Sequence, residues 1–185
     1  MLYLIRHGET EWSKSGQHTG RTDLPLTERG QEEALSLKNY PFPVFNHVFT
    51  SPLKRAKETC RLAGYLEKAT LADALYEWNY GDYEGLTSPE IEKLHPGWNV
   101  FIHGAPGGES IEEVTLRCKQ FLDSLQSLKG PIALFSSGHI LRALTAIYLN
   151  QPLAFGRQIM LKTATISILS HDHGVPAILQ WNLHS

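Results

Sequence analysis

The sequence predicts an α/β fold in which two helical layers cover a mostly parallel central sheet. Short apolar runs alternate with longer segments whose apolar residues recur at helical spacing, which is typical of a three-layer α/β/α sandwich. Two further apolar runs, 164–170 and 176–182, flank Asp172-His173-Gly174 and predict a hairpin that closes the sheet. With 185 residues, the chain is expected to form one domain, residues 1–185.

The first half of the chain alternates apolar runs with helical patterns. The predicted elements are a strand at 2–5, a loop at 13–27, a helix from Thr27, a strand at 47–51, a helix with Pro52 in its first turn, and a strand at 69–75. The loop is polar and rich in turn-forming residues. The first helix is favoured by Thr27, by the acidic residues behind it, and by helical spacing of Ala34, Leu35 and Leu37.

The second half opens with an aromatic and glycine-rich loop, 76–85. The elements predicted after it are a short helix at 88–95, a loop at 95–108, a helix from Ser110 to about Leu128, a strand at 131–137 and a helix from Gly138. Ser110 with Glu113 three residues later forms the pattern of a capping box.

The composition is that of an ordinary globular protein, with 42% hydrophobic and 19% charged residues. A formal net charge of −2 offers no general attraction for nucleic acid or acidic membranes. The two cysteines have no disulfide-framework spacing, and neither a signal peptide nor a membrane span is evident. We therefore expect a cytoplasmic protein.

Chemically active residues follow the predicted strands at the ends where ligands of parallel sheets bind. These residues are Arg6 and His7 after the first strand, Arg55 one turn beyond Thr50-Ser51, Glu77 after the third strand, and Ser137 and His139 after the fourth. Guanidinium groups bind phosphate oxygens, helix N-termini attract anions, and a neutral imidazole is a nucleophile near pH 7. Such a site suits phosphoryl transfer, with Glu77 as the candidate general acid and Glu84 as its alternative.

Five segments in sequence order resemble signature blocks of a known family. The segments "LIRHGETEW", "GRTDLPLTERG", "SPLKRAKET", "EWNYGDYEG" and "PGGES" are similar to those of the histidine phosphatase superfamily, in its phosphoglycerate-mutase-like branch. The resemblance extends from residue 2 to about residue 182. Within that branch, the last two segments look most like the sugar-bisphosphatase subgroup.

The resemblance implies a role for each matching position. His7 would be the nucleophile that forms a phosphohistidine, and Glu77 would be the proton donor. Arg6, Arg55 and Ser13 would bind phosphate. The expected substrate-binding residues are Thr19, Gly20, Arg21 and Thr22, and Arg21 is the candidate for a second phosphate. The arginines would supply the positive charge, so no metal or organic cofactor is expected.

One block departs from the family pattern. Relatives carry a second catalytic histidine after the last central strand, and this position is Ser137 here, in "FSSGHILRAL". A serine donates one hydrogen bond to phosphate but supplies no cation. His139 lies two residues further on, and either it contacts the phosphate with Ser137 or it only caps the helix.

These observations predict a phosphomonoester hydrolase acting on small sugar phosphates, with inorganic phosphate as product and no nucleic-acid or membrane partner. Residues 77–110 are expected to form a small cap over the site. Two alternatives remain, a phosphoglycerate-type mutase and a weakly active protein that binds phosphorylated ligands. Mutases of this branch are longer and shield the site from water, whereas only about thirty residues separate Glu77 from Ser110 here, which favours hydrolysis.

Overall fold

The computed structural model describes residues 1–184, and these contain a six-stranded sheet. The strands are β1 (Leu2–Arg6), β2 (His47–Thr50), β3 (Ala69–Leu71), β4 (Ile132–Ser136), β5 (Ile166–Asp172) and β6 (Val175–Leu183). Their order in the sheet is β3-β2-β4-β1-β5-β6. Strands β1 to β4 pair in parallel, and β5 runs antiparallel to both β1 and β6. The predicted α/β class, the mostly parallel sheet and the terminal hairpin are confirmed.

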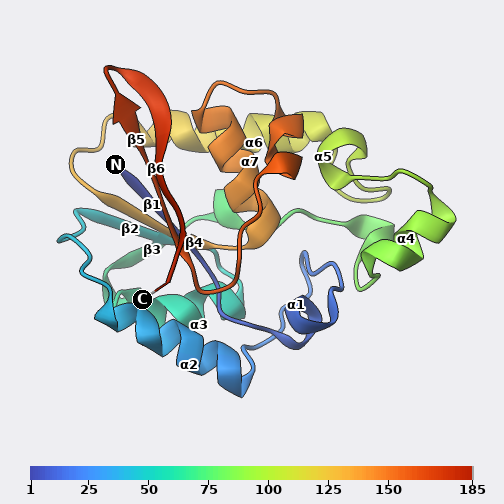
Figure 1. The fold of residues 1–185 in the computed structure, drawn as a ribbon, viewed down its shortest axis with the longest axis horizontal. Helices are drawn as coiled ribbons and strands as arrows, with labels where there is room; N and C mark the ends of the chain where they lie inside the picture. Colours follow the sequence, from blue (N-terminus) through green and yellow to red (C-terminus); the bar gives the residue numbers. More distant parts are fainter. Residues whose placement is uncertain (185) are drawn as a thin grey trace.

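Helices lie on both faces of the sheet. They are α1 (Glu11–Ser15), α2 (Glu28–Ser36), α3 (Lys54–Leu62), α4 (Ser88–Leu94), α5 (Val100–His103), α6 (Ile111–Leu125) and α7 (Gly138–Tyr148). Short 3₁₀ turns add η1 (Leu37–Asn39), η2 (Leu66–Lys68), η3 (Asp73–Leu75), η4 (Gly81–Tyr83) and η5 (Leu153–Gln158). Figure 1 shows α2 and α3 below the sheet and α6 and α7 above it, while α4 and α5 extend to one side. No helix within residues 1–184 has both the length and the apolar character needed to cross a membrane.

The side-chain alternation of the strands builds two separate cores. In β1, Leu2 and Leu4 face the helices α6 and α7, whereas Tyr3 and Ile5 face Leu37 and the α3 side. A strand presents successive side chains to opposite faces, so a strand buried on both faces must be apolar throughout. This burial explains why the central strands are continuous apolar runs.

Several predicted boundaries differ from the structure, including the following four. Helix α1 covers the first residues of the predicted loop 13–27, since Thr10 and Ser13 make a reciprocal capping box just before and within it. Helix α5 forms inside the loop 95–108, with Asn99 accepting from the Phe101 N–H. Pro52 precedes helix α3 instead of occupying its first turn.

The fourth boundary is the end of β3. This strand ends at Leu71 because a 3₁₀ turn over Asp73–Leu75 places Leu75 in the core. The third strand is therefore shorter than the predicted 69–75.

Two glycines allow the segment behind β1 to pass directly against helix α2. A Cβ atom at Gly30 would lie 2.1 Å from the Glu9 carbonyl oxygen, and a Cβ at Gly8 would lie 2.2 Å from the Gly30 carbonyl oxygen. The Thr27 N–H also donates to the Glu9 carbonyl at 2.9 Å. The backbone that follows His7 is thus held by contacts that only glycine permits. The sheet and α2 together fix the position of Arg6 and His7 at the end of β1.

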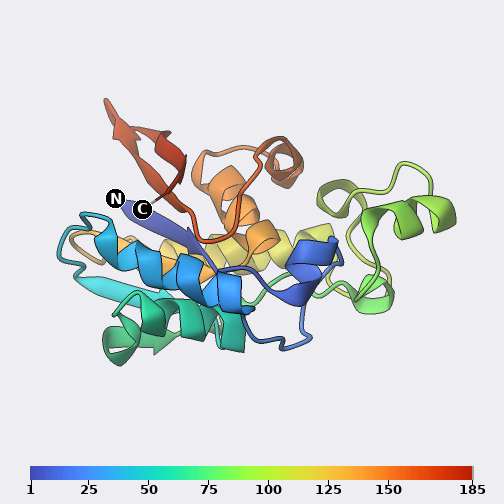
Figure 2. The same cartoon turned by 60° about the horizontal axis from the view of Figure 1, so that its bottom comes forward.

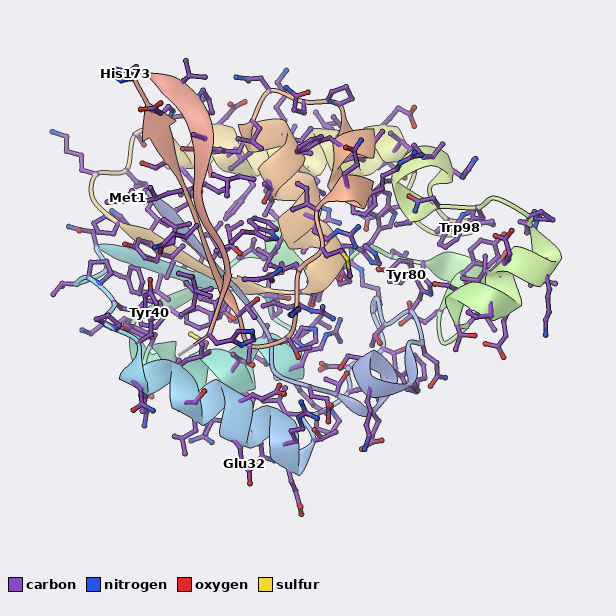
Figure 3. All side chains as sticks on the ribbon, viewed as in Figure 1. Met1, Glu32, Tyr40, Tyr80, Trp98 and His173 are labelled. Atoms are coloured by element: carbon purple, nitrogen blue, oxygen red, sulfur yellow. The ribbon has the colours of Figure 1, made fainter. Side chains whose placement is uncertain are left out.

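We expect Gly30→Ala to lower the free energy of unfolding by roughly 1–3 kcal/mol, because the added methyl group meets backbone atoms that cannot move aside. Urea denaturation measures this effect. The control is Glu32→Ala on the same helix, whose side chain is exposed and points away from the body in Figure 3. Equal stability of the two variants would contradict the close approach.

Candidate active site

A cavity of about 200 Å³ lies at the carboxyl ends of the central strands. It is lined by the end of β1, by segment 12–19, by residues of segment 77–80 and by the first turns of α7. The parallel register explains this convergence, since Arg6 of β1 lies opposite Ser136 of β4 and Thr50 of β2 lies opposite Phe135. Of the predicted site residues, the structure places these at the cavity: Arg6, His7, Ser13, Thr19, Glu77 and His139. It places Gly20, Arg21, Thr22, Arg55 and Ser137 outside the lining.

His7 is buried, with 4% of its surface exposed, and its ring is oriented by its own backbone neighbour. Nδ1 lies 2.7 Å from the Gly8 carbonyl oxygen. A carbonyl oxygen only accepts, so Nδ1 carries the proton and Nε2 keeps its lone pair. Burial, together with the nearby Arg55 and Arg6 charges, lowers the pKa of His7 well below its usual value. His7 therefore presents a neutral, nucleophilic nitrogen near pH 7.

Arg6 supplies a guanidinium group at the same edge. Nη1 donates to the Leu161 carbonyl, while Nε is buried without a hydrogen-bond partner among residues 1–184. The group lies against the start of α7, since a Cβ at Gly138 would be 3.2 Å from both Cζ and Nε of Arg6. The Arg6 side chain also lines the cavity, where its positive charge favours an anion.

Arg55 is fully buried and does not line the cavity. Its donors are directed at three carbonyl oxygens and one hydroxyl: Thr22 (2.9 Å), Thr19 (3.0 Å), Gly20 (2.9 Å) and the Ser137 Oγ (3.3 Å). The guanidinium group is nonetheless close enough to His7 to be the largest charge effect on its pKa. In this structure, Arg55 organises the loop at residues 19–22 beside the nucleophile.

Glu84, the alternative acid, lies on the other side of the same loop. Its Oε1 accepts from the N–H groups of Gly20 at 2.8 Å and Thr22 at 3.0 Å, and it does not line the cavity. Arg55 thus binds the carbonyl groups of the loop and Glu84 binds its N–H groups. Arg21 turns outward, with its guanidinium carbon 4.2 Å from the centre of the Tyr76 ring.

Glu77 lies at the cavity and caps the N-terminus of α7. Oε1 accepts from the Ile140 N–H at 2.7 Å and the Trp78 N–H at 2.9 Å, and Oε2 accepts from the His139 N–H at 2.9 Å. Helix N-termini carry unpaired N–H groups and a partial positive charge, both of which favour a carboxylate. The N-cap residue Ser137 makes no capping hydrogen bond, so Glu77 takes over that function from another segment.

His139, rather than Ser137, brings an imidazole to the cavity. Ser137 is fully buried and accepts from Arg55. The His139 Nδ1 is hydrogen-bonded to the Tyr80 hydroxyl, and the ring stacks parallel to His18 with centroids 6.0 Å apart. Burial and the charges of Arg142, His18 and Arg6 lower the pKa of His139 well below its usual value. The ring is therefore neutral near pH 7.

Sequence reasoning missed Arg142 and Tyr80, which also line the cavity. Arg142 donates through Nε to the Gly156 carbonyl at 2.9 Å and lies over the Phe101 ring at 4.7 Å. Its signal was present in the helix pattern, since Arg142 follows His139 by three residues and shares its helix face. Tyr80 gave no comparable signal, because an aromatic residue in a loop is as typical of a core as of a site.

Comparison with known proteins identifies the family. The profile of the histidine phosphatase superfamily (branch 1) matches residues 2–184, and the chain belongs to this superfamily.

Particular relatives support the same assignment. An acid phosphatase of Mycobacterium tuberculosis is 39% identical over 182 residues, covering 94% of this chain and 88% of that protein. Sedoheptulose 1,7-bisphosphatase of Saccharomyces cerevisiae is 34% identical over 88% of this chain and 70% of its own length. Among solved structures, the product of a Mycobacterium tuberculosis open reading frame superposes with a TM-score of 0.92 at 35% identity, over 99% of this chain and 97% of the other. Two bacterial phosphoglycerate mutases match 65% and 77% of the chain.

The pH dependence of stability tests the environment of His7. An unfolded histidine titrates near pH 6.5, and folding lowers the pKa of His7, so below pH 6.5 the unfolded chain binds a proton that the folded chain excludes. We expect this to remove up to about 1.4 kcal/mol of stability per pH unit as the pH falls. Urea denaturation between pH 7.5 and pH 5 should show a shallower decline for His7→Gln than for wild type. The exposed His95→Gln variant is the control, and equal slopes for wild type and His7→Gln would refute the assignment.

Loop anchoring by Glu84 is tested separately. Glu84→Ala removes a charged acceptor from two backbone N–H groups, and such bonds contribute about 1.5–3 kcal/mol. We expect KM for a phosphate ester to rise about 10-fold with a smaller change in kcat, because the loop loosens while the nucleophile stays in place. Exposed Glu112→Ala is the matched control. A collapse of kcat at unchanged KM would instead assign Glu84 to the chemistry.

Proposed function

We propose that this protein hydrolyses phosphomonoesters of small molecules, sugar phosphates foremost, through a phosphohistidine on Nε2 of His7. The single observation that carries the proposal is the orientation of His7. The Nδ1–H group donates to the Gly8 carbonyl, and the ring lines the cavity together with the Arg6 side chain. That arrangement presents a lone pair and an anion-binding donor to the same small space.

The reaction divides into two displacements. The Nε2 lone pair of His7 attacks phosphorus, the ester bond breaks, and the leaving oxygen takes a proton from Glu77. Glu77 is protonated when substrate binds, and the N–H groups of α7 stabilise the carboxylate that remains after the transfer. Water then attacks the phosphohistidine and returns a proton to Glu77, releasing inorganic phosphate and neutral His7. Arg6 at the cavity and the nearby charge of Arg55 would stabilise the phosphoryl oxygens during both steps. Since these groups provide the positive charge, the proposed mechanism requires no metal ion.

The size of the cavity supports a small substrate. About 200 Å³ is below the usual range of roughly 300–1,000 Å³ for pockets that hold drug-sized ligands. Relatives named as an acid phosphatase and a sugar bisphosphatase agree with such substrates. Within the loop at residues 19–22, Thr19 reaches the cavity, and we propose the loop as the wall that contacts the substrate beyond its phosphate.

Hydrolysis is favoured over mutase activity by the segment above the cavity. We propose residues 77–110 as a small cap, because α4 and α5 extend away from the sheet layers in both Figure 1 and Figure 2. Helices this short offer little cover to protect a phosphoenzyme from water during isomerisation. We also propose a cytoplasmic location, in keeping with the buried thiols of Cys60 and Cys118.

The test combines turnover with trapping of the intermediate. Wild type is expected to release inorganic phosphate from p-nitrophenyl phosphate and from several sugar phosphates. His7→Ala should lower kcat at least about 1,000-fold. Rapid acid-free quenching after labelled substrate should yield a phosphohistidine that maps to His7. Glu32→Ala, on exposed surface, is the control.

Two results would overturn the proposal. Saturable binding of phosphate esters by wild type without turnover would indicate a ligand-binding protein. Isomerisation of a monophosphoglycerate without release of inorganic phosphate would indicate a mutase.

A further inference from the structure

Ser137 does not line the cavity. Its side chain is fully buried, and its hydroxyl accepts a hydrogen bond from the Arg55 Nε–H. The only imidazoles lining the cavity within residues 1–184, apart from His7, are those of His18 and His139. His18 is bound through Nδ1 to the Leu86 carbonyl at 2.9 Å, on the cap side. His139 lies on the first turn of α7, on the same turn as Gly138, which contacts Arg6.

The ring of His139 is held on several sides. Tyr80 and Phe101 meet it edge-on, with ring centroids 5.8 Å and 5.3 Å away, and His18 stacks on it. The Tyr80 hydroxyl is hydrogen-bonded to Nδ1, whereas Nε2 has no hydrogen-bond partner among the described residues. Figure 3 shows Tyr80 close to the lower end of α7, between the sheet layers and the cap, with Trp98 further out in the cap.

The hydrogen bond between Tyr80 and His139 decides which ring nitrogen of His139 carries the proton. Tyr80 is 1% exposed, and burial beside Glu77 raises the pKa of its hydroxyl well above its usual value, so the hydroxyl keeps its proton. That proton has one acceptor within residues 1–184, the Nδ1 atom of His139. If Nδ1 carried the proton instead, the Tyr80 hydroxyl would be a buried donor without an acceptor, which costs about 1–3 kcal/mol. The proton of the neutral ring is therefore on Nε2.

We propose that Tyr80 is a positioning residue which fixes His139 as an Nε2–H donor to an oxygen of the transferred phosphoryl group. The proposal rests on the proposed function and adds a residue pair to it. Glu77 contributes through the backbone, because its carboxylate binds the His139 N–H while Tyr80 binds the ring. One short segment, 77–80, therefore sets both the backbone and the side chain of this histidine.

The first experiment reads the tautomer directly and needs no turnover. Nitrogen-15 shifts of the histidine rings should show His139 protonated at Nε2 in wild type. In Tyr80→Phe the tautomer should shift toward protonation at Nδ1. Inorganic phosphate should move the Nε2–H resonance of His139 in wild type and move it less in Tyr80→Phe. Tyr83→Phe, which removes a nearby buried hydroxyl group, is the matched control and should resemble wild type.

The second experiment measures coupling between the two residues. With p-nitrophenyl phosphate, His139→Ala should lower kcat about 100-fold, as expected for loss of one donor to a developing anion. Tyr80→Phe should lower kcat about 10-fold in the wild-type background and less than twofold in the His139→Ala background.

Three results would overturn the inference. They are an Nδ1–H tautomer of His139 in wild type, a phosphate response that is the same in Tyr80→Phe, and an equal effect of Tyr80→Phe in both backgrounds. If wild type hydrolysed no phosphate ester, the proposed function would fail. The tautomer and the phosphate titration would still decide the role of Tyr80.

Discussion

The bond between the Glu77 carboxylate and the N-terminus of α7 is the interaction on which the rest of the site depends. A helix that begins directly after a central strand exposes several N–H groups, and Ser137 does not cap them with its side chain. Glu77 accepts from two of these groups and thereby joins the segment after β3 to the helix after β4. The join is reinforced by Trp78, which is fully buried and donates through its indole N–H to the Glu109 carbonyl at 2.9 Å. Because Glu77 and Trp78 are both held in place, the segment that follows them brings Tyr80 against His139.

The same positive charges perform two functions at the nucleophile. Burial lowers the pKa of His7, and the charges of Arg55 and Arg6 lower it further, which keeps the lone pair available. During transfer of a phosphoryl group, these positive charges stabilise the negative charge that develops on its oxygens. Arg55 acts on His7 through its charge while its N–H groups hold the loop at 19–22, whereas the Arg6 side chain lines the cavity itself. A cation thus affects the chemistry here without lining the cavity.

The framework of this fold was readable from the sequence because its signals are local and periodic. The β1 run is apolar throughout because both of its faces are buried, and the Ser110–Glu113 capping box marks the start of α6 within a single turn. Helices α1 and α5 were missed because they have only five and four residues, too few to show a helical period. Because His7 and Glu77 follow predicted strands in the sequence, they could be placed at the carboxyl edge of the sheet. The sequence could not show that Arg55 donates to carbonyl groups, because this depends on how the distant loop at 19–22 folds.

Ser137 is compatible with this arrangement because its side chain is small enough to pack directly against Arg55. Its hydroxyl accepts from the Arg55 Nε–H in a fully buried position, which leaves the other Arg55 donors directed at the loop. The imidazole of His139, two residues further on, lies where Glu77 binds its backbone N–H and Tyr80 binds its ring. The Ser137–Arg55 bond and the Tyr80–His139 contact are therefore parts of one packing arrangement around the start of α7.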